Sequence, residues 1–382
     1  MDLRSPNYFY FLRRASQGII PRVLATDRRQ AKVVNGYPPK ESIMSDPIID
    51  ISPLGAPPWP TADPFLFCVH HLDRYPRGTE AMGPEPDLLK GRPIGNDFSG
   101  KDGWSMYHGQ QVPGFPQHPH RGFETVTLAR QGYIDHSDSL GAKARFGHGD
   151  VQWMTAGGGV VHSEMFPLVH RDKPNTTELF QIWLNLPAEN KLVDPHFAMF
   201  WSDEIPQKTY VDDEGNETTL TVVAGAIDEL TPPEPPPKSW ANNSQNHVAI
   251  WTLELAPKAS WTVPPAPEGT NRSLYIFEGQ GARIAGRDVP NGQRVQVEPT
   301  SELEIVNGPE PTEILVLQGR PIEEPVAQHG PFVMNYPGEI RKAMLEYQQT
   351  GFGGWPFDEP APVHPREEGR FAVHGDGRKE RP

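Results

Sequence analysis

The sequence is poor in cysteine. Cys68 is the single cysteine among 382 residues, so no intramolecular disulfide can form and no metal cluster can be held by cysteines alone. One thiol in a chain of this length agrees with a reducing compartment. Any metal ion that the protein holds is therefore expected to bind histidines and carboxylates.

Long apolar runs and excess positive charge are also missing. No stretch of about eighteen apolar residues occurs, so no membrane span is predicted. The 49 Asp and Glu residues outnumber the 35 Lys and Arg residues, and the formal net charge is −14. Without a large cationic surface, the chain is not expected to bind nucleic acid directly or to bind an anionic membrane. A protein partner stays compatible with this composition.

The beginning of the chain gives no clear secondary-structure pattern. Residues 1–58 carry proline and charge without a sustained hydrophobic period, and we expect an N-terminal extension of undefined order. Aromatic residues at 7–12 precede two arginines, which is the reverse of the order in a secretory signal. An ordered or frayed extension is favoured over a transit peptide at residues 12–30, because Asp27 counts against the latter. We expect a cytoplasmic protein, or one that is also nuclear in a eukaryote.

The rest of the chain alternates short β-rich pieces with turns of glycine, proline and aspartate, a pattern typical of sandwiches and barrels. One set of strands is predicted over residues 59–230, with a long surface loop at residues 75–101. A proline-rich stretch at residues 231–237 ends this set, and a second set follows at residues 238–355. The predicted fold class is all-β, with two tandem β-barrels.

The hydrophobic period becomes helical near the end of the second set. Ile340 and Ala343 share one face of a predicted helix that begins near Pro337 and ends at Gly351. Proline and charge then return, and residues 356–382 are predicted to form a mobile tail. A short C-terminal helix therefore completes the predicted all-β fold.

Two pairs of residues are the strongest candidates for metal ligands. His118 and His120 are two positions apart, and so are His162 and Glu164. Alternate residues of a strand point to the same face, roughly 6–7 Å apart at Cα, so each pair can direct two ligand atoms at one ion. Three imidazoles and a carboxylate suit Fe, Mn, Ni, Cu or Zn, and an open coordination position would make the site catalytic.

The sequence around these pairs resembles the pirin family of the cupin superfamily, and the resemblance extends from about Asp63 to Trp355. The stretches that carry it are Asp63-Pro-Phe-Leu66, His118-Pro-His-Arg-Gly-Phe-Glu-Thr125, Gly149-Asp-Val-Gln-Trp-Met-Thr-Ala-Gly157, His162-Ser-Glu-Met165, Gln181-Ile-Trp-Leu-Asn-Leu186 and Gln328-His-Gly-Pro-Phe-Val-Met-Asn335. It implies a bicupin, with two cupin-type β-barrels, in which the N-terminal barrel holds one mononuclear metal ion, usually iron. The second set of strands has no paired histidines and is expected to be metal-free.

Carried over to this sequence, the resemblance places the metal ligands at His118, His120, His162 and Glu164. The general cupin pattern would instead use Glu124 as the carboxylate, and the sequence leaves this choice open. Glu124 lies about 13 Å beyond His120 along a straight strand, so it would need a bulge to reach the same ion. We therefore expect Glu164 to be the ligand and Glu124 to lie behind the ligands, where it could orient an imidazole.

The resemblance also implies an activity, quercetin 2,3-dioxygenation, in which a metal-bound flavonol and O₂ react and carbon monoxide is released. The metal expected for this chemistry is Fe(II), and Glu164 is expected to act as the catalytic base for the flavonol hydroxyl. Four apolar side chains are candidates either for the mouth of a flavonol pocket or for the barrel core: Phe115, Phe123, Trp153 and Met154. The alternative function is a non-catalytic iron-binding regulator, either a transcription cofactor or a redox sensor with a protein partner.

Overall fold

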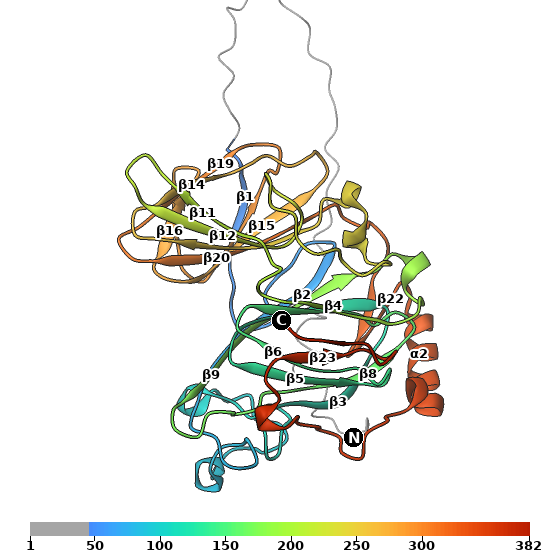
Figure 1. The fold of residues 1–382 in the computed structure, drawn as a ribbon. Helices are drawn as coiled ribbons and strands as arrows, with labels where there is room; N and C mark the ends of the chain where they lie inside the picture. Colours follow the sequence, from blue (N-terminus) through green and yellow to red (C-terminus); the bar gives the residue numbers. More distant parts are fainter. Residues whose placement is uncertain (1–45) are drawn as a thin grey trace, which may run out of the picture.

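Two β units, each made of two facing sheets, lie one above the other in this computed structural model, which describes residues 46–382 (Figure 1). Most of the predicted N-terminal extension, including the segment weighed as a transit peptide, lies outside the described residues. The all-β fold class with one helix near the C-terminus is confirmed. Among residues 46–382, no helix is long and apolar enough to cross a bilayer.

The first unit contains the two candidate ligand pairs. Its strands are β2 (Phe65–Tyr75), β3 (Gly114–His120), β4 (Phe123–Gln131), β5 (Tyr133–Asp138), β6 (Lys143–Gly147), β7 (Asp150–Thr155), β8 (Val160–Met165), β9 (Asn175–Asn185), β10 (His196–Phe200), β23 (Phe371–Val373) and β24 (Lys379–Glu380). One sheet has the order β10-β7-β4-β9-β2, and the facing sheet has the order β24-β23-β6-β5-β8-β3. The strands of this unit pair in antiparallel fashion, as expected for strands joined by short turns.

The second unit contains a larger and a smaller sheet. Its strands are β1 (Ile48–Pro53), β11 (Gln207–Val211), β12 (Glu217–Ala224), β13 (Ala249–Leu255), β14 (Ser260–Val263), β15 (Asn271–Glu278), β16 (Gly281–Ile284), β17 (Arg287–Pro290), β18 (Gln293–Val297), β19 (Leu303–Asn307) and β20 (Thr312–Gly319). The larger sheet has the order β1-β18-β15-β20-β13-β12-β11, and the smaller has the order β14-β19-β16-β17. Buried aliphatic side chains from both sheets fill the space between them.

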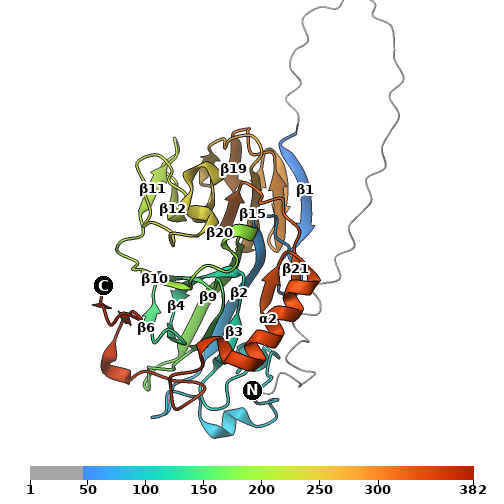
Figure 2. The ribbon, with the colours of Figure 1, turned by 90° about the vertical axis from the view of Figure 1, so that its right-hand side faces the viewer.

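The C-terminal helix returns from the second unit to the first, and Figure 2 shows it beside a small hairpin. That hairpin is β21 (Ala327–His329) with β22 (Phe332–Met334), and the helix is α2 (Pro337–Thr350). Glu339 in the first turn of α2 accepts hydrogen bonds from the Asn335 and Tyr336 amides, at 3.1 and 2.9 Å. These bonds satisfy amides that the helix itself leaves unpaired. The predicted helix is therefore confirmed.

The two units share an apolar core, which is built by the alternation of strand side chains. On β4, Val126 and Leu128 face the second unit, and they pack with side chains such as Ile250 and Leu317. Thr125 and the other odd-numbered residues of β4 point to the opposite side, into the first unit. The interior of the first unit is therefore more polar than the core between the units.

The structure differs from the predicted domain boundaries in three places. Residues 48–53 pair with β18 and thus belong to the second unit. Residues 207–224, expected in the first unit, form two strands of the larger sheet of the second. In the expected mobile tail, residues 371–373 pair with β6, and Ala372 is fully buried. These pairings join segments far apart in the sequence, so local patterns did not indicate them.

Candidate metal centre

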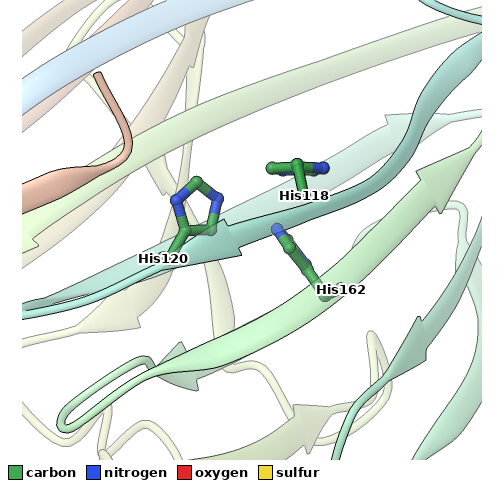
Figure 3. Close-up of side chains that lie close together, drawn as sticks. All are labelled: His118, His120 and His162. Carbon is green, nitrogen blue, oxygen red and sulfur yellow. The ribbon is translucent and has the colours of Figure 1, made fainter. Parts of the chain in front are cut away.

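Three histidines of the first unit converge in one place, as Figure 3 shows. The antiparallel register of β3 and β8 places His118 directly opposite His162. His120 lies two residues along β3 on the same face, and its ring centroid is 4.8 Å from that of His118 and 4.8 Å from that of His162. One ligand nitrogen from each ring lies within 4.8 Å of the others. Three nitrogens at this separation can bind one transition-metal ion.

The ring nitrogens fit a metal site in their chemistry as well. The Nδ1 atom of His118 lies 2.8 Å from the Pro116 carbonyl oxygen. An N–H donated there leaves Nε2 of His118 as the ligand atom. Among the described residues, Nδ1 of His120 and both ring nitrogens of His162 are buried without a hydrogen-bond partner. Buried polar atoms normally have a partner, and an ion bound by the triad would give one to Nδ1 of His120 and to one nitrogen of His162.

Burial keeps all three imidazoles neutral. Desolvation lowers the pKa of His118 to about 4, although the Pro116 carbonyl partly opposes the shift. Desolvation and the neighbouring His118 lower the pKa of His120 well below its usual value. The pKa of His162 is also well below its usual value, mainly because the ring is buried. A neutral imidazole is the form that binds a metal ion, so the triad needs no deprotonation near neutral pH.

Glu164 lies beside the triad on the same strand as His162. One of its carboxylate oxygens is 3.9 Å from Nε2 of His162, and the other accepts a hydrogen bond from the Thr127 hydroxyl at 3.1 Å. Burial raises the pKa of the Glu164 carboxyl above its usual value. The Thr127 hydroxyl oxygen is also 2.6 Å from Oε1 of Gln181. Glu164 is thus held at the edge of the triad by a polar group on the facing sheet.

Glu124 does not lie near the triad. It is on the face of β4 that carries Val126, and its carboxylate accepts hydrogen bonds from Thr155 and Ser239, both at 2.6 Å. Strand alternation therefore turns it toward the core between the units. The expectation that Glu124 orients an imidazole is wrong. Because the carboxyl is buried, its pKa is raised to about 7.

A third pair at the same spacing was overlooked in the sequence. His136 and Asp138 lie on β5, where the register places His136 opposite Glu164 and Asp138 opposite His162. The His136 ring receives a hydrogen bond from the Gln152 amide at 2.8 Å, and its other nitrogen lies 3.1 Å from an Asp138 oxygen. The ring centroids of His136 and His162 are 5.5 Å apart. The spacing of His136-Ser-Asp138 could have pointed to this pair.

His118, His120 and Glu164 line a cavity with mainly apolar walls. The apolar side chains that line it are Phe67, Val69, Phe98, Phe115, Ile134, Phe166, Leu179 and Trp183. Of the four side chains expected at a pocket mouth, Phe115 lines this cavity. The other three, Phe123, Trp153 and Met154, are fully buried elsewhere in the core. Aromatic rings on several walls favour a flat aromatic ligand.

The predicted surface loop is partly buried and helps to form the cavity. Arg92 and Asp97 form an ion pair at 3.0 Å in which both side chains are fully buried. The Arg92 guanidinium also donates to the Trp104 carbonyl and lies 3.4 Å above the centre of the Trp104 ring. These contacts hold Phe98 at the cavity wall. Sequence reasoning missed this role because it depends on contacts within the folded loop.

Comparisons with known proteins place this architecture in a family. Residues 94–184 match the Pirin family and residues 250–353 match the Pirin C-terminal cupin domain. The chain is 36% identical over 250 residues to a pirin-like protein of Solanum lycopersicum. The aligned region covers 63% of this chain and 78% of the relative. It is 35% identical over 245 residues to Pirin-1 of Arabidopsis thaliana, and this alignment covers 63% of this chain and 78% of Pirin-1.

A solved structure agrees with this relationship. The crystal structure of quercetin 2,3-dioxygenase from Acinetobacter baumannii matches with a TM-score of 0.59 and 28% sequence identity, and covers 76% of this chain and 86% of that one. The chain therefore belongs to the pirin family and has the two cupin domains of a bicupin. The His118, His120 and His162 triad is consistent with one bound metal ion.

Proposed function

We propose that this protein is a metal-dependent dioxygenase that opens flavonols such as quercetin. The observation that carries the proposal is the cluster of three neutral imidazoles beside a cavity with aromatic walls, which His118 and His120 line. The similarity to a quercetin 2,3-dioxygenase supports it. Iron(II) is the metal that we expect. When bound, it would supply a Lewis acid for the flavonol oxygens and a relay for electrons to O₂.

We assign Glu164 as the fourth metal ligand. Its position 3.9 Å from Nε2 of His162 brings a carboxylate oxygen to the edge of the triad. Together with the triad, this oxygen would give a common donor set of three imidazoles and one carboxylate. Thr127 would hold the second carboxylate oxygen through its hydroxyl. This contact limits the rotation of the Glu164 carboxylate.

Glu164 also has the chemistry of a general base. The carboxylate lines the cavity, so it can lie within hydrogen-bond reach of a flavonol hydroxyl. Removal of that proton gives an electron-rich flavonolate, which reacts with O₂. Both oxygen atoms of O₂ enter the substrate, the heterocycle opens, and one ring carbon leaves as carbon monoxide. In this step, Glu164 would hold the hydroxyl proton.

The cavity walls would bind and orient the flavonol. Phe115 and Phe166 offer aromatic faces, and their ring centroids are 6.1 Å apart. Leu179 and Trp183 contribute apolar surface from β9. A flat, largely apolar ligand in this space would exclude water from the reacting atoms, which protects the flavonolate from protonation.

Aerobic assays of the reconstituted protein test this function. Protein loaded with one equivalent of iron is mixed with quercetin, and flavonol absorbance, O₂ uptake and carbon monoxide are measured together. The proposal predicts equal molar amounts of flavonol lost, O₂ consumed and carbon monoxide formed. Protein that holds iron but consumes no flavonol would contradict the enzymatic proposal and would favour a regulatory role for the metal centre.

A further inference from the structure

The cavity beside the metal centre has another polar group, the imidazole of His71. Odd-numbered residues of β2 point into the first unit, and Phe67, Val69 and His71 all line the cavity. Phe67 and Val69 are apolar, so His71 adds a polar group to an otherwise apolar part of the cavity wall. Neither the resemblance to pirins nor the spacing of residues in the sequence indicated a role for His71.

His71 begins a chain of hydrogen bonds that ends at a buried carboxylate. Its Nδ1 atom lies 2.8 Å from the Tyr107 hydroxyl oxygen. That hydroxyl donates to Oδ2 of Asp73 at 2.7 Å. The other carboxylate oxygen of Asp73 accepts the backbone amide of Ser105 at 2.8 Å. Both oxygens of Asp73 therefore receive donors, which is the arrangement of an ionised carboxylate.

These bonds determine which nitrogen of His71 carries the proton. Tyr107 has one hydroxyl proton, which it gives to Asp73, so its oxygen must accept the Nδ1–H of His71. In a neutral ring, Nε2 then keeps its lone pair and can only accept a hydrogen bond. Burial lowers the pKa of His71 to about 3, which keeps the ring neutral. Burial raises the pKa of Asp73 to about 6, so this carboxyl is still ionised at pH 8.

The loop that carries Tyr107 is fixed by contacts of its own. The Asp97 carboxylate, which pairs with buried Arg92, also accepts the backbone amide of Met106 at 3.1 Å. Tyr107 and Asp97 exchange two backbone hydrogen bonds, each of 2.8 Å. The Tyr107 ring stacks on that of Phe115, with 5.0 Å between centroids. The hydroxyl that orients His71 is therefore held in place before any ligand arrives.

Phe115 lies between His71 and the metal triad. The Phe115 ring centroid is 6.1 Å from that of His71 and 6.4 Å from that of His118. All three side chains line the same cavity. A flat molecule that lies along the Phe115 ring can therefore reach from the triad to His71. Its two ends would meet different chemistry, a metal ion at one end and a hydrogen-bond acceptor at the other.

We propose that Nε2 of His71 accepts a hydrogen bond from a hydroxyl group on the aromatic ring of the substrate that lies farthest from the metal. This inference rests on the proposed function and narrows its substrate class to flat polyphenols with a hydroxyl on that remote ring. His71 is then a specificity-determining residue, and Tyr107 and Asp73 are positioning residues that keep its acceptor nitrogen free of a proton.

Binding of two matched flavonols tests the proposal. Quercetin has hydroxyls on its remote ring, and galangin is the same flavonol without them. Their dissociation constants are measured by calorimetry at pH 8, without O₂, on the metal-loaded protein. We expect wild-type protein to bind quercetin about 10-fold more tightly than galangin, as for one good hydrogen bond. His71→Leu should reduce this ratio to about 1, and His71→Gln should restore part of it.

Two further variants separate a specific role from general damage. Val69→Ala changes the same face of β2, and it should weaken both flavonols equally and keep the ratio. Tyr107→Phe should lower the ratio, because Nδ1 loses its fixed acceptor and the ring can place its proton on Nε2. Equal binding of both flavonols to wild-type protein, or an unchanged ratio in His71→Leu, would overturn the proposed role of His71. Neither result would contradict the proposed function. If neither flavonol binds the wild-type protein, this inference and the proposed function are both overturned.

Discussion

His118 and His162 stand directly opposite one another in the β3–β8 ladder, with ring centroids 4.4 Å apart. They come from strands that are separated by four other strands in the sequence. The pairing of the ladder therefore makes the metal site, and each strand alone supplies only part of it. Because side chains alternate along both strands, a register shift of one residue would turn one histidine away from the other.

Glu164 and Glu124, which are both buried, should differ sharply in their effect on catalysis. Glu164→Gln keeps the shape of the side chain but removes its charge and most of its basicity, so flavonol oxygenation should fall by about 10²-fold or more. Glu124→Gln should change turnover far less, because Glu124 is hydrogen-bonded to Thr155 and Ser239 on the other face of its strand. Steady-state rates with quercetin, corrected for iron content, measure both effects. A larger loss in Glu124→Gln than in Glu164→Gln would reverse this assignment.

Glu124 should instead affect how stability depends on pH. Its pKa is raised to about 7 by burial, so the folded protein binds a proton there more tightly than the unfolded chain does. The contribution of Glu124 to stability is therefore greatest at low pH and falls as the pH rises above the unfolded pKa and through 7. Between pH 5 and pH 8, the wild type should lose about 2 kcal/mol relative to Glu124→Gln. Denaturant unfolding of both proteins across this range measures the difference, and a pH-independent difference would contradict the assignment.

The sequence predicted that His118, His120 and His162 come together, although only the spacing of the first two is local. His118 and His120 are two residues apart, and that spacing alone indicates a shared strand face. The orientation of Glu124 was within reach of the same reasoning, since it alternates in phase with Val126 and Leu128. Local sequence patterns could not indicate that this apolar face packs against the second unit and not into the interior of the first.

Contacts between segments far apart in the chain could not be predicted from local sequence patterns. The hydrogen bonds of His71 join β2 to Tyr107, which lies 36 residues away. The strands at residues 48–53 and 371–373 are short, and each is defined by a partner strand far away in the chain. Such pairings are stabilised by tertiary packing and not by the residues of the segment alone, so local propensity does not indicate them.

The ion pair of Arg121 and Glu346 should couple helix α2 to the end of strand β3, which carries His118 and His120. Arg121 follows His120 directly, and its guanidinium makes two hydrogen bonds of 2.8 Å to the Glu346 carboxylate. Arg121 is buried whereas Glu346 is half exposed, so solvent screening limits the pair to a coupling energy of about 1 kcal/mol. A double-mutant cycle with Arg121→Met and Glu346→Gln measures it by chemical unfolding. The more exposed pair Lys208 and Glu229 serves as a control, with a smaller coupling expected.

The single thiol should report on the core between the units. Cys68 is fully buried, and this burial raises its pKa well above the usual value, so the reactive thiolate is scarce and shielded. We expect DTNB to label native protein at least 100-fold more slowly than protein in denaturant. Rapid labelling of the native protein would show that strand β2 or the core around it opens readily.

Metal content is the most direct test of the central claim, that the triad and Glu164 hold one ion. After reconstitution with iron under anaerobic conditions and removal of loose metal, elemental analysis should find about one equivalent per wild-type chain. The His118→Ala/His162→Ala double variant should retain less than about a tenth of an equivalent. His196→Ala, which removes an exposed histidine of the same unit, should remain fully loaded. Wild-type protein without metal, or a double variant with full occupancy, would contradict the account.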